Sequence, residues 1–146
     1  MKLRVAWVGK AKEAAIQSLI SEYVKRISRY VSCEPIEAAS EPALLTAIKK
    51  SSRVPPVFVA LDSRGKQLSS EELAKFIDQH QERGTQELIF AIGPADGWTD
   101  ETRSQAGLLL SLGRMTLPHE LARVVLLEQI YRAYTILKGH PYHTGH

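Results

Sequence analysis

The sequence predicts an α/β domain built on a mainly parallel sheet with helices on both faces. Short apolar runs alternate with segments of helical periodicity along the whole chain, the order expected of strands joined by right-handed crossover helices. Two of the runs, 57–62 and 87–92, are apolar at nearly every position, as is typical of strands buried on both faces of a parallel sheet. The length of 146 residues fits one domain spanning 1–146.

The first half of the chain shows two alternations of strand and helix. Residues 2–8 form an apolar run closed by Gly9, and the next segment repeats apolar residues at helical spacing. A further strand is suggested around Pro35, although that proline weakens it, and Pro55-Pro56 stops the chain after the following helix. The elements expected here are a strand over 2–8, a helix over 16–27, a strand over 31–36 and a helix over 41–50.

The second half starts with the strand over 57–62, after which we expect 63–66 to turn the chain. Ser69 and Glu72 have the spacing of a capping box, and Thr99 is placed to cap a short polar helix. The last helix is apolar nearly all round, which predicts burial on several sides. The elements expected after the turn are a helix from Ser69 to Gly84, a strand over 87–92, a helix from Thr99 to Gln105, a strand over 108–112 and a helix over 119–138.

Composition excludes several classes of protein. The formal net charge of +3 permits a polyanionic partner but does not require one. The single cysteine, Cys33, excludes an internal disulfide and a multi-cysteine metal site, and it suits a reducing compartment. The N-terminal segment lacks the apolar core of a signal peptide, and no run approaches the ~18 apolar residues needed to span a bilayer. We therefore expect a cytoplasmic protein with no membrane contact.

Binding sites in parallel sheets lie beyond the carboxyl ends of the strands, so the loops after Leu61, Ile92 and Leu112 are the candidates. The sequence contains neither the G-x-G-x-x-G of dinucleotide-binding domains nor the G-x-x-x-x-G-K-[ST] of nucleoside triphosphatases. Ordinary nucleotide binding is thereby disfavoured.

A set of motifs follows the strand end at Leu61 in a fixed order. They are Ile92-Gly-Pro-Ala-Asp-Gly97, Met115-Thr-Leu-Pro-His119 with Arg123, Glu128 with Tyr131-Arg-Ala133, and His140-Pro-Tyr-His143. In this order they resemble the ribosomal RNA large subunit methyltransferase H family, a branch of the SPOUT methyltransferases, and the resemblance covers the whole chain. It implies a C-terminal trefoil knot, a homodimer, S-adenosylmethionine as the cofactor, and methylation of N3 of a pseudouridine in 23S rRNA.

The resemblance also implies a cofactor pocket in which main-chain shape matters more than side-chain identity. One departure concerns Gly93-Pro94, where the family usually has two glycines, so that the loop loses one N–H and is stiffened. The cofactor-binding residues expected from the resemblance are Leu61, Gly93, Pro94, Gly113, Arg114, Met115, Thr116, Leu117 and Pro118.

The expected catalytic residues are Arg132, Tyr142 and His143. The N3 proton of a uracil-type ring must leave before the nitrogen attacks a sulfonium methyl, which requires orientation and a proton acceptor. His143 is suited to accept that proton directly or through water, and Tyr142 to stack on the base or to hydrogen-bond its edge. We favour Arg132 over Arg123 for substrate contact, because its motif leads into the tail.

The histidines allow other interpretations. His140, His143 and His146 recur at every third position, which suggests a metal site, but the segment contains proline and glycine and no carboxylate, so we expect no metal. A frayed tail is the plainer alternative. His119 begins a helix, and we expect it to be a neutral histidine that fixes a loop.

The expected partners are 23S rRNA in the assembled ribosome and a second copy of the chain. Five basic residues add phosphate contacts or form a solvated helix face: Lys10, Lys12, Lys25, Arg26 and Arg29. The rival hypothesis is a non-catalytic ribosome- or RNA-binding factor that keeps the fold but has lost the cofactor through Pro94. Only the enzyme requires a cofactor pocket.

Overall fold

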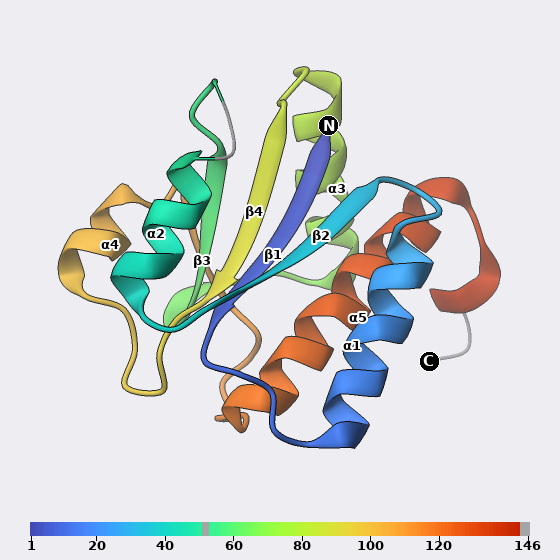
Figure 1. The fold of residues 1–146 in the computed structure, drawn as a ribbon. Helices are drawn as coiled ribbons and strands as arrows, with labels where there is room; N and C mark the ends of the chain where they lie inside the picture. Colours follow the sequence, from blue (N-terminus) through green and yellow to red (C-terminus); the bar gives the residue numbers. More distant parts are fainter. Residues whose placement is uncertain (51–52, 144–146) are drawn as a thin grey trace.

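One parallel sheet of five strands organises the molecule (Figure 1). The structure, a computed structural model, describes residues 1–50 and 53–143, apart from the side chain of His143. The strands pair in the order β2-β1-β4-β3-β5, and every pair is parallel. They are β1 (Lys2–Val8), β2 (Ser32–Ala38), β3 (Val57–Gln67), β4 (Glu87–Ile92) and β5 (Leu108–Ser111).

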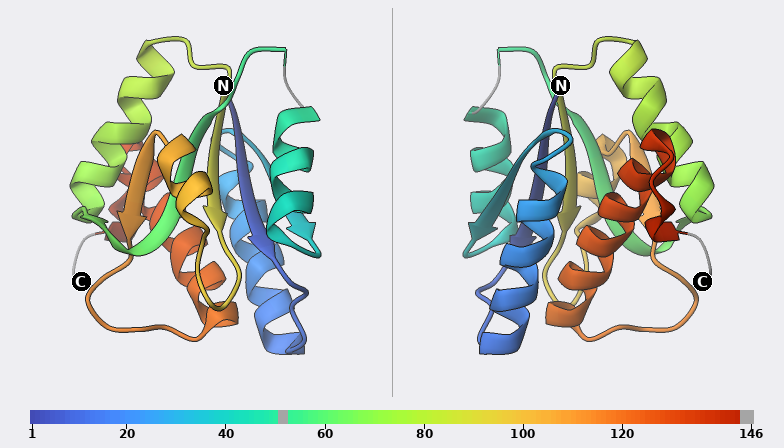
Figure 2. Two further views of the ribbon diagram at one scale, coloured as in Figure 1. Left: turned by 90° about the vertical axis from the view of Figure 1, so that its left-hand side faces the viewer. Right: turned by 90° about the vertical axis from the view of Figure 1, so that its right-hand side faces the viewer.

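Helices cover both faces of the sheet, which confirms the predicted fold class (Figure 2). One face carries α1 (Ala14–Ile27), α3 (Ser70–Glu82) and α5 (His119–Lys138), whose apolar residues form the larger buried cluster. The other carries α2 (Glu41–Lys50) and α4 (Asp100–Gln105) over the smaller cluster. A short 3-10 turn, η1 (Pro141–His143), follows α5.

Local signals in the sequence set the helix ends as predicted. Ser69 and Glu72 form the complete capping box at the start of α3, and the Thr99 hydroxyl accepts a hydrogen bond from the Thr102 N–H at the start of α4. The longest helix, α5, ends at Gly139, whose φ of 69° is a left-handed conformation that glycine adopts without strain. It packs between α1 and α3, which explains its apolar surface on several sides.

The predicted turn at 63–66 is wrong, because β3 continues to Gln67. Leu61 and Lys66 both pair with Leu110 of β5, so the residues between them form a bulge within the strand. Gly65 lies so close to β5 that an added Cβ would be 2.6 Å from the Leu109 carbonyl carbon. The glycine that suggested a turn is instead needed for this close approach of two strands.

Three further expectations concern the helices and the chain path. The apolar residues that repeat at helical spacing after Gly9 include Leu19, whose position in this pattern predicts burial, but it is 41% exposed in α1. Within the described residues, no helix is long and apolar enough to cross a membrane. The trefoil knot implied by the resemblance stays a prediction.

Candidate active site

Two adjoining hollows open at the carboxyl ends of β3, β4 and β5. The first, of about 190 Å³, lies between the β3 bulge and the loop 112–117 that follows β5. The second, of about 240 Å³, lies between the loop after β4 and the start of α5. Leu61, Leu117 and Ala122 line both hollows, which makes them neighbouring parts of one depression at the edge where parallel sheets bind ligands.

The structure brings the predicted cofactor-binding residues together at this depression. Leu61 and Leu117 line both hollows, Gly93 and Pro94 line the second, and Gly113, Arg114, Met115 and Thr116 line the first. Pro118 lines neither hollow and instead directly precedes α5. Met115 is 85% exposed, so the loop after β5 presents an apolar side chain to solvent.

The loop after β4 begins with a closed turn. The Gly97 N–H donates to the Pro94 carbonyl at 2.8 Å, and Gly97 has a φ of 92°. Gly93, by contrast, does not have a positive φ. The glycine is needed there because an added Cβ would lie 2.7 Å from Cδ2 of Trp98. Pro94 is therefore part of an ordered turn rather than a disruption of the loop.

The start of α5 is fastened to two strand ends. His119 Nε2 lies 2.5 Å from the Gly93 carbonyl oxygen, while Arg123 Nη2 lies 3.2 Å from His119 Nδ1 and 3.2 Å from the Val8 oxygen. A guanidinium only donates, so His119 Nδ1 accepts and its Nε2–H donates to Gly93, which is the neutral tautomer. The predicted role of His119 in fixing a loop is confirmed.

The side chain of Arg123 is buried in the core of the protein. It is 1% exposed, and its guanidinium lies 5.2 Å from the centre of the Trp7 ring. Burial lowers the pKa of Arg123, and Glu37, with Oε1 3.7 Å from Nη1, opposes that shift. Within the described residues, Nε and Nη1 have no hydrogen-bond partner. This arginine is a structural element beneath the depression and is not available to a substrate.

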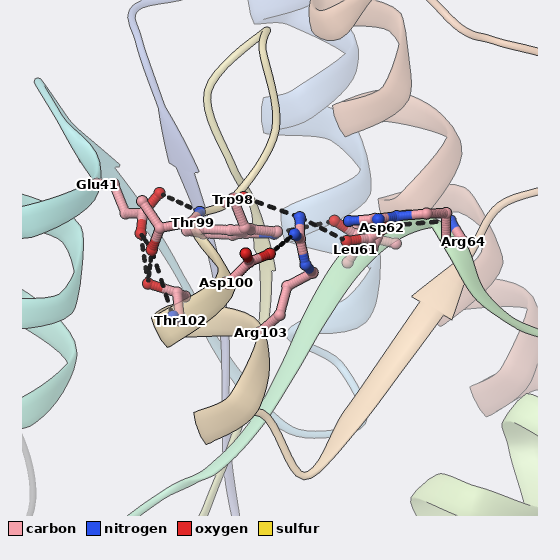
Figure 3. Close-up of polar contacts among 9 residues, drawn as sticks. All are labelled: Glu41, Leu61, Asp62, Arg64, Trp98, Thr99, Asp100, Thr102 and Arg103. Atoms are coloured by element: carbon pink, nitrogen blue, oxygen red, sulfur yellow. Dashed lines mark hydrogen bonds and ion pairs between the residues drawn. The ribbon is translucent and has the colours of Figure 1, made fainter.

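Trp98 connects the ends of β3 and β4 (Figure 3). Its indole Nε1–H donates to the Leu61 carbonyl at 2.9 Å, and its ring lies against Gly93. The side chain is 5% exposed and lines the second hollow. Sequence reasoning missed Trp98, since nothing in the local pattern shows that this residue folds back toward another strand.

A buried carboxylate anchors the segment that follows Trp98. Glu41 of α2 accepts from the Thr99 hydroxyl at 2.6 Å, from the Thr99 N–H at 3.2 Å and from the Thr102 hydroxyl (Figure 3). Burial raises the pKa of Glu41, but the hydrogen bonds from Thr102 and Thr99 outweigh it and leave the pKa below its usual value. The carboxylate is therefore ionised at neutral pH and ties α2 to α4.

Arg103 holds the other side of the same segment. Its Nη1 donates to the Trp98 carbonyl at 2.9 Å and lies 3.6 Å from Asp62 Oδ2, and its Nη2 pairs with Asp100. Asp62 lines the first hollow. Arg103 thus links the two hollows through their supporting residues.

Two of the three predicted catalytic residues, Arg132 and Tyr142, lie in a separate cluster at the far end of α5. Nη2 and Nε of Arg132 donate to Glu128 Oε2 at 2.7 and 3.1 Å, and the Tyr142 hydroxyl donates to the same oxygen at 3.0 Å. The Arg132 guanidinium lies 5.2 Å from the centre of the Tyr142 ring, which also packs edge-on against Tyr131. Burial first, and then hydrogen bonds with Tyr23 and Glu128, raise the pKa of Tyr142, so it stays a neutral phenol.

The tail is docked on this helix end as far as it is described. The Tyr30 hydroxyl and His140 Nδ1 lie 2.5 Å apart, which argues against a frayed segment there. The side chain of His143, and all of His146, lie outside the described residues. Among the described residues, no group of three or more histidine, cysteine, aspartate or glutamate side chains is placed to hold a metal ion.

One protomer does not bring the two predicted sets of residues together. Arg132 follows His119 by thirteen positions on the same helix, which corresponds to roughly 20 Å at 1.5 Å per residue. The depression lies at the start of α5, and the tail cluster lies toward its end. Figure 1 shows the course of α5 between these two ends.

Comparison with known proteins decides the family. Residues 1–143 match the family model described as "Predicted SPOUT methyltransferase". The chain belongs to the SPOUT methyltransferase family. Two relatives, each named Ribosomal RNA large subunit methyltransferase H, match over nearly their full length. The protein of Koribacter versatilis (strain Ellin345) is 62% identical over 146 residues, covering 100% of both chains. That of Deinococcus radiodurans is 46% identical over 147 residues, covering 99% of this chain and 100% of the relative.

A solved structure shares the SPOUT methyltransferase fold. It is the SpoU methyltransferase AviRb from Streptomyces viridochromogenes in complex with the cofactor AdoMet, with a TM-score of 0.54 and 12% sequence identity. The similarity covers 91% of this chain and 58% of that one. At this level of identity the comparison speaks for the fold alone.

Proposed function

We propose that this protein is an S-adenosylmethionine-dependent methyltransferase that acts on ribosomal RNA. The depression at the carboxyl ends of β3, β4 and β5 carries the proposal, because eight of the nine residues expected to hold the cofactor line it. The names of the full-length relatives support ribosomal RNA as the substrate class. The finer assignment, N3 of a pseudouridine in 23S rRNA within the assembled ribosome, rests on the sequence motifs.

The residues of the depression fit such a cofactor. Leu61 and Leu117 offer apolar surface in both hollows, and the loops that contain Gly93 and Gly113 complete their lining. When bound, the cofactor supplies a methyl group on a sulfonium that a nucleophile attacks in line. The part of the protein is to hold that group and to exclude water from it.

The tail cluster is suited to the second substrate. Tyr142 is a neutral phenol whose hydroxyl donates to Glu128, and its ring, which packs against Arg132 and Tyr131, is the group that we assign to stacking on a base. Arg132 provides a fixed positive charge for a phosphate or for the ring oxygens. We assign acceptance of the N3 proton to His143.

The separation of these two sets supports a homodimer in which one protomer provides the depression and its partner provides the tail cluster. The paired helices α1 and α5 each expose one leucine, Leu19 at 41% and Leu121 at 40%, and we place the second copy against these helices. A symmetric dimer of this kind would contain two equivalent composite sites.

Calorimetric titration with S-adenosylmethionine and its demethylated product is the first test. Saturable binding with a fixed stoichiometry per subunit is expected, while a folded protein that binds neither compound at millimolar concentration is a non-catalytic RNA-binding factor instead. Methylation is then measured by mass spectrometry of nucleosides, on ribosomes and on an RNA hairpin. We expect N3-methylpseudouridine from ribosomes and poor turnover of the hairpin.

Complementation tests the composite site. Arg132→Ala removes the tail cluster and Gly113→Val obstructs the depression, so each variant alone should be inactive. Mixed after unfolding and refolding together, they form heterodimers that hold one intact site, and part of the activity should return. Continued inactivity of a proven heterodimer contradicts the composite site without contradicting cofactor binding.

A further inference from the structure

The ladder between β3 and β4 ends at the pair Leu61 and Ile92, immediately before the depression. Beyond that pair, the indole of Trp98 connects the ends of the two strands. Its N–H donates to the Leu61 carbonyl at 2.9 Å, and its ring lies against Gly93, the residue that follows β4. One side chain therefore contacts both strand ends that carry expected cofactor contacts.

The position of Trp98 is itself fixed from several sides. The ring packs edge-on against Phe58, with centroids 6.0 Å apart and an interplanar angle of 85°. The main-chain carbonyl of Trp98 accepts from Arg103 at 2.9 Å, and the N–H of the next residue, Thr99, donates to Glu41 at 3.2 Å. Contacts from α2, α4 and β3 thus hold the indole in one orientation (Figure 3).

We propose that Trp98 is a positioning residue for the cofactor, which locks the ends of β3 and β4 at the spacing that the second hollow requires. Glu41 and Arg103 hold the main chain at and next to Trp98 in place. The role rests on the proposed function, because it concerns the same depression. It differs from ordinary core packing in requiring the indole N–H, which a buried side chain that only fills space does not need.

The central test is Trp98→Phe, which keeps an aromatic ring and removes the N–H. We expect the Kd for the demethylated cofactor to rise roughly threefold to tenfold, the range of one lost hydrogen bond, with kcat at saturating cofactor unchanged. Tyr134→Phe is the control. It also keeps an aromatic ring and removes a buried polar group, the hydroxyl that accepts from Gln81 of α3 at 3.2 Å, and it should leave the Kd unchanged. Equal Kd values for Trp98→Phe and the wild type overturn the proposal, as does an equal rise for Tyr134→Phe.

A double-mutant cycle tests the contact with Gly93. Gly93→Ala places a Cβ within 2.7 Å of the indole and should weaken cofactor binding more than tenfold. In a Trp98→Leu background the indole is gone, so Gly93→Ala should cause a much smaller further loss. The same loss in both backgrounds shows that Trp98 does not set the position of this strand end.

Hydrogen exchange separates this inference from the proposed function. The amides of Gly93 and of residues 95–97 should exchange faster in Trp98→Phe than in the wild type without any ligand present. If the wild type binds no cofactor, the proposed function fails, and faster exchange still supports the role of Trp98 in ordering the loop. Unchanged exchange removes that role as well.

Discussion

The two ends of α5 carry the same charged side chain in contrasting surroundings. Arg123, near the start, is 1% exposed and donates to the Val8 carbonyl and to His119. Arg132, two and a half turns later, has an 18% exposed side chain that shares the Glu128 carboxylate with Tyr142. The first arginine supports the depression from beneath, while the second forms a partly exposed ion pair with Glu128. The position along the helix therefore decides whether an arginine is enclosed in the scaffold or stays partly exposed.

The largest effect that follows from this contrast is on stability. Arg123→Ala removes a fully buried side chain and leaves the Val8 carbonyl without this donor, so the free energy of unfolding should fall by about 3 kcal/mol. Arg132→Ala, at a partly exposed ion pair, should cost no more than about 1 kcal/mol. Urea denaturation of the two variants measures the difference, and equal losses would contradict the division between the two ends.

The next effect concerns catalysis at the tail cluster. Arg132→Lys keeps the charge but loses the two hydrogen bonds from Nε and Nη2 to one carboxylate oxygen. We expect the methylation rate on ribosomes to fall about thirtyfold. This is more than the loss of one charged hydrogen bond would cause and less than a misplaced catalytic group would cause. Cofactor Kd should stay within a factor of two. A comparable rise in cofactor Kd would show that Arg132 contributes to cofactor binding rather than to the second substrate.

The sequence predicts features that depend on neighbouring residues better than features that depend on contacts between distant parts of the chain. Elements with local signals were predicted well, since a capping box and an apolar run depend on neighbours along the chain. The bulge at Gly65 was misread as a turn, because its cause is the approach of β5, a strand more than forty residues later. Trp98 was missed for the same reason, as its partner Leu61 lies far away in sequence. Long-range contacts leave no periodic trace.

A smaller effect tests the link from α5 to the loop after β4. His119→Phe keeps a ring and removes the N–H that donates to the Gly93 carbonyl and the nitrogen that accepts from Arg123. The Kd for the cofactor should rise roughly fivefold, as expected for one hydrogen bond of about 1 kcal/mol. Calorimetric titration measures this change, and Arg132→Ala is the control at the other end of the helix. An unaltered Kd would show that the histidine orders the loop without influencing the pocket.

The smallest effect distinguishes two roles for Tyr142. Its hydroxyl already donates to Glu128 at 3.0 Å, so a substrate base would meet the ring rather than a free hydroxyl. Tyr142→Phe should therefore reduce the methylation rate by less than about threefold, because stacking depends on the ring face. Tyr142→Ala, which removes the ring and its contact with Tyr131, should reduce the rate far more. If the two variants lose equal activity, the hydroxyl acts on the substrate, and Glu128 serves to orient it.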